Sequence, residues 1–194
     1  GHGIARYSRE LFTAVTKQNE IEMLPVAAWS SLDQSSLQKL VADTGLQILS
    51  SGRRLTPLNW LLFNSPAIET SLPVTVDLVH ATSLGYPIAT RKPYIVTIHD
   101  LGPLTHPEYF GNKSPWIMKY SLKQAVNKAK RFICVSRSTA DELVDYVGGN
   151  IEDRVVVTHE GVNAYMFAQP GTSATAQLVN MPPTDVPFIL STGK

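Results

Sequence analysis

The chain has 194 residues, of which 43% are apolar, enough for one α/β domain with a packed core and part of a second. Its formal net charge of +1 lacks the basic excess typical of nucleic-acid-binding domains. The lone Cys134 excludes an internal disulfide framework, and no apolar run reaches the roughly 18 residues of a membrane-spanning helix. The sequence therefore predicts a globular protein of a reducing compartment with no nucleic-acid partner.

A glycine-containing turn opens the chain and leads into a helix. Gly1 and Gly3 precede residues 4–15, where apolar side chains such as Ile4 and Tyr7 recur at helical spacing. The free N–H groups of a helix N-terminus suit a phosphate, and glycines allow its close approach. The alternative is a flexible start before an amphipathic helix. A functional turn also implies a leading strand that this chain lacks.

Two elements with clear boundaries follow. Residues 21–29 are typical of a strand that Pro25 confines to a sheet edge. Residues 35–44 predict a short helix, which Gly45 ends.

A basic pair stands in the least regular part of the chain. Arg53 and Arg54 adjoin an apolar, tryptophan-containing stretch, residues 55–63. They indicate either a solvated pair before a partly buried helix or a flap that meets a lipid-linked or phosphorylated substrate.

Histidines follow two predicted strands. Residues 74–80 alternate like a strand and end in His80, and the β-branched run 94–98 leads directly into His99 and Asp100. In open α/β sheets, ligands bind beyond the carboxyl ends of the strands. We therefore expect His99 and Asp100 at a ligand site. The alternative for His99 and Asp100 is a helix-capping pair, and the alternative for His80 is a core position.

The next helices and strand have recognisable ends. Ser114 and Pro115 are typical of a helix N-terminus. Residues 132–135 predict a buried strand, and Ser138 and Asp141 have the spacing of a capping box for the helix after it, which Gly148 and Gly149 are expected to end.

Polar residues again follow the strands. Ser136 and Arg137 leave the strand 132–135, whereas Glu160 and Gly161 leave a strand predicted over 155–158. Alternation of strands and helices predicts an α/β fold with a doubly wound parallel sheet.

The composition also predicts domain boundaries. Residues 1–167 form the predicted domain, residues 168–186 are rich in Pro, Thr, Ser and Ala and indicate a linker, and residues 187–194 begin a further strand and glycine turn. We interpret that strand as the first of a second, truncated domain.

Motifs in chain order resemble those of family 4 glycosyltransferases, which are retaining enzymes of the GT-B fold. They are GHGIARYSREL, VDLVHATS, YIVTIHDLGPLTHPEYF, FICVSRSTADEL, VVVTHEGVN and PFILSTGK. The stretches TIHDL and HPEYF are most similar to mannosyltransferases that build bacterial surface polysaccharides. The resemblance implies a Rossmann-like N-terminal, acceptor-side domain, the first strand of which is missing.

The resemblance also implies roles for individual residues. Gly1 and Gly3 match the loop that approaches the donor diphosphate, and His99 matches the histidine that contacts the transferred sugar. The expected acceptor-side residues are Asp100, His80, Ser136, Arg137, Glu160 and Gly161.

The implied activity is transfer of a sugar, with retention, from a nucleotide-sugar such as GDP-mannose or a UDP-sugar to a glycan or lipid-linked acceptor. We expect no cofactor and no metal. The family's phosphate-clamping Arg and Lys would lie beyond Lys194, so we expect the chain alone to be inactive. A nucleotide-sugar epimerase of the same fold and a non-catalytic α/β binding module are the alternatives.

The expected location is the cytoplasm, with peripheral contact at the inner face of the cell membrane. Because a sheet without its first strand exposes an edge, we also expect self-association.

Overall fold

The computed structural model describes residues 3–18, 20–27, 33–49, 55–85, 87–110 and 113–161. The strands are β1 (Val26–Ala27), β2 (Gln47–Ile48), β3 (Val79–Ala81), β4 (Tyr94–Ile98), β5 (Arg131–Cys134) and β6 (Val155–Val157). The α-helices are α1 (Gly3–Val15), α2 (Gln34–Thr44), α3 (Leu55–Phe63), α4 (Gly102–Thr105), α5 (Lys113–Lys128) and α6 (Arg137–Val147). Single turns of 3-10 helix are η1 (Ile68–Ser71), η2 (Pro107–Tyr109) and η3 (Glu152–Arg154).

The chain divides into two compact units. The first ends at Glu160, and the second runs from Gly161 to Lys194. The predicted linker 168–186 and the predicted strand 187–194 lie outside the described residues. Everything below concerns the first unit.

The described strands form two parallel sheets, which confirms the predicted Rossmann-like α/β class. Strands β3, β4, β5 and β6 form a four-stranded sheet in that order, and β1 pairs with β2. Helices make most of the connections between consecutive parallel strands: α2 lies between β1 and β2, α5 precedes β5, and α6 precedes β6. The connection from β3 to β4 has no helix among its described residues.

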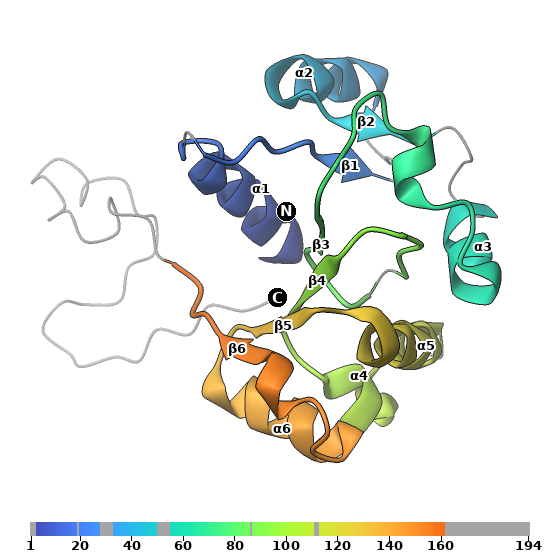
Figure 1. Ribbon diagram of the computed structural model, residues 1–194, viewed down its shortest axis with the longest axis vertical. Helices are drawn as coiled ribbons and strands as arrows, with labels where there is room; N and C mark the ends of the chain where they lie inside the picture. The colour runs from blue at the N-terminus through green and yellow to red at the C-terminus, as the bar shows by residue number, and fades with distance from the viewer. Residues whose placement is uncertain are drawn as a thin grey trace, which may run out of the picture. The chain divides into compact units, whose positions relative to one another are not determined.

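Alternate side chains of strand β4 point to opposite faces of the sheet, and both faces are covered. Val96 and Ile98 belong to one buried cluster with Leu122 of α5 and Leu143 of α6. Thr97, between them, makes a hydrogen bond with Tyr7 of α1. Helix α1 and the pair α5 and α6 therefore lie on opposite sides of the sheet (Figure 1). The strand that leads to His99 is thus held firmly in place.

Two predicted strands pair over fewer of their described residues than expected. Among the described residues of the strand expected over 21–29, pairing is confined to β1, next to which the carbonyl oxygen of Pro25 accepts from Gln47 N at 2.9 Å. The strand expected over 74–80 begins at Val79, because pairing with β4 starts only there. His80 therefore lies within β3 and not beyond its end.

Helix ends follow local chemistry, with two corrections. Gly45 and Gly148 adopt positive φ angles of 70° and 94° and end α2 and α6, as predicted. The cap of α6 is Ser136, whose side chain accepts from Thr139 N, so the predicted capping box at Ser138 is wrong. Helix α5 begins at Lys113, slightly before the predicted start.

Candidate functional site

The carboxyl ends of the parallel strands gather polar groups from distant parts of the sequence. His99 follows β4 directly, as predicted, and only 14% of its side chain is exposed. Its Nδ1 lies 3.0 Å from Glu160 Oε1, beyond β6, and its Nε2 lies 3.0 Å from the carbonyl oxygen of Thr82, beyond β3. Because parallel strands end at a common edge, residues 17 and 61 positions away meet at one imidazole.

Helix α1 completes the surroundings of His99. The ring of Tyr7 meets the imidazole edge to face, with centroids 4.8 Å apart and planes at 87°. The hydroxyl of Ser8 donates to Thr82 Oγ1 at 2.8 Å. These contacts attach the helix to the strand exits. No residue of α1 is buried, and Ile4 of its apolar stripe is 44% exposed.

A polar network lies directly beneath the site. Thr97 is fully buried, and its hydroxyl lies 3.2 Å from Tyr7 Oη and 2.9 Å from His80 Nε2. Burial lowers the pKa of His80, because the charged imidazolium loses its hydration. His80 is therefore a neutral residue that packs behind the site. Among the described residues its side chain bonds to Thr97 and makes no hydrogen bond to His99 or Glu160.

Ser136 belongs to the support of His99. The hydroxyl of Ser136 caps α6 and lies 2.9 Å from Thr139 Oγ1. The hydroxyl of Thr139 in turn donates to the carbonyl oxygen of His99 at 3.3 Å. Arg137 is exposed on the first turn of α6. Ser136 is thus connected through Thr139 to the backbone of His99, whereas Arg137 is exposed to solvent.

Asp100 turns away from His99. Its Oδ1 accepts from Gly102 N at 2.9 Å, so this carboxylate closes the turn into α4. A side chain at Gly102 would displace Phe110, because an added Cβ would lie 2.9 Å from the ring of Phe110. Asp100 is exposed, but its geometry is that of a loop cap.

The contacts within the chain do not explain the glycines of the predicted donor loop. Gly3 is the first residue of α1 and precedes Tyr7 by about one helical turn, while Gly1 lies outside the described residues. An added Cβ at Gly3 would meet nothing within 4 Å, so packing within the chain does not require a glycine there. Gly161 follows Glu160 in the exit loop and is likewise open.

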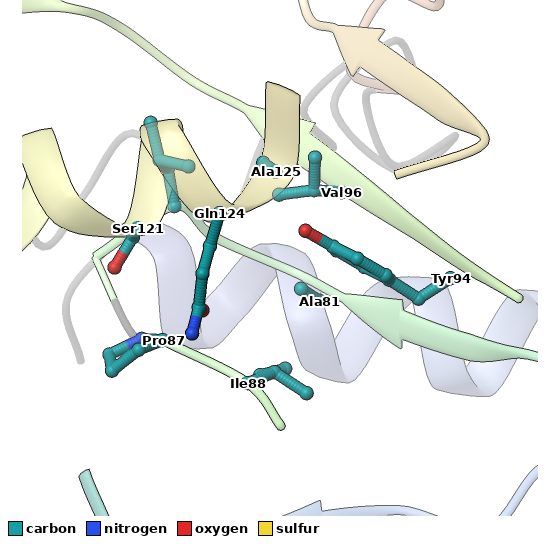
Figure 2. Close-up of a pocket in the computed structure, with 9 residues that line it drawn as sticks. Ala81, Pro87, Ile88, Tyr94, Val96, Ser121, Gln124 and Ala125 are labelled. Carbon is teal, nitrogen blue, oxygen red and sulfur yellow. The ribbon is translucent and has the colours of Figure 1, made fainter. Parts of the chain in front are cut away.

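Two hollows among the described residues have linings that do not include His99. Figure 2 shows a small pocket between β3, β4 and α5, lined among others by Tyr94, Ser121 and Gln124. Its volume of about 10 Å³ suits one water molecule at most. A wider, open hollow of about 320 Å³ lies between Glu69 and Lys92, but Glu69 already accepts from Thr90 and from Arg91 N.

No metal centre is evident in the described part of the chain, where no group of three or more His, Cys, Asp or Glu side chains is close enough to hold an ion. None of the described helices is both long and apolar enough to cross a bilayer. Cys134 is fully buried, and burial raises the pKa of its thiol to about 11, so it behaves as a core residue.

Comparison with protein families identifies the domain. The sequence profile of Glycosyltransferase Family 4 matches residues 2–164. The chain belongs to glycosyltransferase family 4. The match covers the first unit except Gly1, and it includes all four strands of the larger sheet and every contact of His99 described above. The search of curated proteins and the search of solved structures each found no match.

Membership of family 4 assigns a general activity, the transfer of a sugar from a donor to an acceptor. It also confirms the resemblance to family 4 for the motifs that lie within residues 2–164. Sequence reasoning found His99 and Glu160 separately but missed Tyr7, Thr82 and Thr97 as their neighbours. For Tyr7 the available signal was its place on a helix next to the glycine turn, and for Thr82 its place just after His80. No local signal distinguishes Thr97 from any other core threonine.

Proposed function

We propose that the full-length parent transfers a sugar, with retention, from a nucleotide-sugar such as GDP-mannose or a UDP-sugar to a glycan or lipid-linked acceptor. This chain would supply the acceptor side of the site, within a predicted domain 1–167. The observation that carries the proposal is the position of His99 in a family 4 domain: it leaves the central strand β4 and is fixed by three other segments. The likeness of TIHDL and HPEYF to mannosyltransferases favours a mannosyl donor and a role in surface polysaccharide synthesis.

The chemistry of transfer explains the need for such a residue. Breaking a bond between a sugar and a diphosphate develops negative charge on the phosphate and positive charge on the sugar. Preorganised hydrogen bonds to those charges lower the barrier most effectively. A histidine that is held rigidly can make a hydrogen bond to a sugar hydroxyl without first losing side-chain freedom.

Replacing the histidine in the parent tests the proposal. We expect His99→Ala to lower kcat for sugar transfer by about 100-fold, the usual effect of removing one preorganised hydrogen bond from a reacting centre. His106→Ala is the matched control, because His106 pairs with Glu108 on the surface and both side chains are mostly exposed. Turnover is measured as release of nucleotide together with analysis of the glycosidic product.

Three results would contradict the proposal. Unchanged turnover in His99→Ala would remove this residue from the site. Formation of an epimerised nucleotide-sugar without an acceptor would favour the epimerase. Absence of any reaction in the parent would favour a binding module.

We also propose a peripheral contact with the cytoplasmic face of a membrane that contains anionic lipids. The α3–α5 surface consists of exposed apolar side chains on two neighbouring helices: Leu58, Leu62, Phe63, Trp116 and Tyr120. The helices are adjacent, since Gln124 Nε2 donates to the carbonyl oxygen of Trp60 at 2.8 Å. Exposed apolar side chains of this size suit insertion among lipid headgroups.

The charges around the α3–α5 surface favour an anionic partner. Helix α3 contains no charged residue, and α5 contains no acidic one. Lys119 and Lys123 of α5 are exposed beside the aromatic pair Trp116 and Tyr120, whose ring centroids lie 4.9 Å apart. Arg53 and Arg54, interpreted above as either a solvated pair or a flap, lie outside the described residues.

Vesicle sedimentation tests the membrane proposal. We expect the chain to bind vesicles of phosphatidylglycerol and phosphatidylcholine, and Leu62→Glu with Phe63→Glu to weaken binding about tenfold through lost apolar contact and added repulsion. Ile21→Glu, at a site that is 55% exposed but off this surface, is the control. Equal binding to purely zwitterionic vesicles, or no binding, would contradict the proposal.

Self-association remains a prediction with a structural basis. Among the described strands β3 has a single neighbour, β4, so its other edge offers unpaired backbone groups. We expect light scattering after gel filtration to give a mass that rises with protein concentration. A constant monomer mass would contradict this prediction.

A further inference from the structure

The two ring nitrogens of His99 both face oxygen atoms that accept hydrogen bonds. Nδ1 faces the carboxylate of Glu160, and Nε2 faces the backbone carbonyl of Thr82, each at 3.0 Å. A neutral imidazole carries one hydrogen, so it can donate to only one of the two. The arrangement is therefore complete only when the ring carries both hydrogens, and otherwise one contact must give way.

The contact with Thr82 is the one that yields. A hydrogen bond to a carboxylate is charge-assisted and stronger than one to a backbone carbonyl. A bare Nδ1 would also place its lone pair against the negative charge of Glu160. The ring therefore keeps its hydrogen on Nδ1, and Nε2 is the nitrogen that can exchange its partner.

We propose that Glu160 is a positioning residue that holds a hydrogen on Nδ1 of His99, so that Nε2 can exchange the carbonyl of Thr82 for a hydroxyl of a bound sugar. The identity of that hydroxyl as a sugar group rests on the proposed function. The assignment of the hydrogen to Nδ1 rests only on the contacts of this chain.

The surroundings of His99 support this role for Glu160. The edge-to-face contact with Tyr7 limits rotation of the ring, and the hydroxyl of Thr139 fixes the backbone of His99. Asp100, the nearest other carboxylate in sequence, accepts a hydrogen bond from Gly102 N. Among the described residues, Glu160 is thus the single acidic side chain within hydrogen-bonding distance of this imidazole.

Nitrogen NMR of the histidine rings tests the assignment directly in this chain. Long-range ¹H–¹⁵N spectra show which ring nitrogen carries hydrogen, and loss of one set of signals in His99→Gln assigns them. We expect His99 to carry hydrogen on Nδ1 at pH 7.5. We expect Glu160→Ala to move it to Nε2, where it can bond to Thr82, and Glu160→Gln to give a mixture.

The exposed pair of His106 and Glu108 provides a matched control, since its Nδ1–Oε1 distance is 3.3 Å. Glu108→Gln should leave the signals of His99 unchanged. Hydrogen on Nε2 alone of His99, with none on Nδ1, in the unsubstituted chain would overturn the proposal. So would an unaltered Nδ1–H form in both Glu160 variants. If Glu160→Ala fails to fold, the unsubstituted chain and Glu160→Gln still decide the matter.

Kinetics of the parent separate positioning from acceptor binding. A positioning residue should affect kcat, so we expect Glu160→Gln to lower kcat about tenfold and to leave KM for the acceptor within about twofold. A rise in KM alone would make Glu160 an acceptor contact and overturn the proposal. If His99→Ala is inactive and both Glu160 variants are normal, only this inference fails. If the parent shows no transfer, the NMR result still tests the hydrogen assignment.

Discussion

The two sheets of the first unit differ in how much structure surrounds them. In the four-stranded sheet, β4 and β5 each have a neighbour on both sides, and their inward side chains reach full burial at Ile98 and Phe132. The pair β1 and β2 is joined over two residues of each strand. Its own side chains stay partly exposed, with Ile48 at 38%. The comparison explains where the candidate site lies, because a precise site needs strands that cannot shift.

The smaller sheet depends on a separate set of contacts. Its buried cluster consists of Leu49, Trp60, Ile68 and Ala89. Two-stranded pairs are marginal by themselves, and so this cluster supplies much of their stability. We expect the region of β1 and β2 to open more easily than the region of β4 and β5.

Removing the largest fully buried side chain of the larger sheet should have the largest effect. Phe132 is fully buried in β5, and Arg154 lies over its ring at 5.4 Å. We expect Phe132→Ala to lower the free energy of unfolding by about 3–5 kcal/mol, measured by urea denaturation. Val156→Ala on the neighbouring strand, where 44% of the residue is exposed, should cost no more than about 1 kcal/mol. Equal costs would contradict the difference in packing between these positions.

A matched truncation in the smaller sheet sharpens the comparison. Leu49 follows β2 and is 5% exposed. We expect Leu49→Ala to cost about 2–3 kcal/mol, toward the low end of the range for leucine, because a less enclosed site can relax. Hydrogen exchange should show faster exchange at the amides of Gln47 and Leu49, with those of β4 and β5 unchanged. Equal acceleration in both sheets would show that they unfold as one unit.

The smallest predicted effect concerns acid. Burial lowers the pKa of His80 below the ordinary value of 6.5, so around pH 6 the unfolded chain binds a proton that the folded chain does not. Stability contributed by the neutral His80 is therefore present above pH 6.5 and is lost as the pH falls below it. We expect the urea midpoint to fall between pH 7.5 and pH 5.

Replacing His80 provides the control for that pH effect. His80→Gln keeps a hydrogen-bonding group near Thr97 and removes the titration. We expect it to flatten the decline, whereas His106→Gln, at an exposed site, should leave it unaltered. An unchanged decline in His80→Gln would assign the acid sensitivity to other groups.

Local sequence was sufficient for several elements of this chain. The β-branched run before His99 formed the central strand, because continuous apolar character suits a strand covered on both faces. Gly45 and Gly148 ended their helices, because each adopts a conformation that glycine tolerates best. These features depend on short-range chemistry, so composition and spacing were enough to predict them, together with the fold class and the place of His99 at the strand exit.

Only the tertiary structure decided the partners. Glu160 and Thr82 meet at His99 through the alignment of β6 and β3 with β4, and no spacing in the sequence encodes which nitrogen each will face. The same is true of Thr97, whose hydroxyl joins Tyr7 and His80 across a sheet and a helix. Local pattern determines which face of a strand is covered, whereas contacts between elements depend on how the whole sheet pairs. His99 was therefore predictable as a residue, and its chemical surroundings were not.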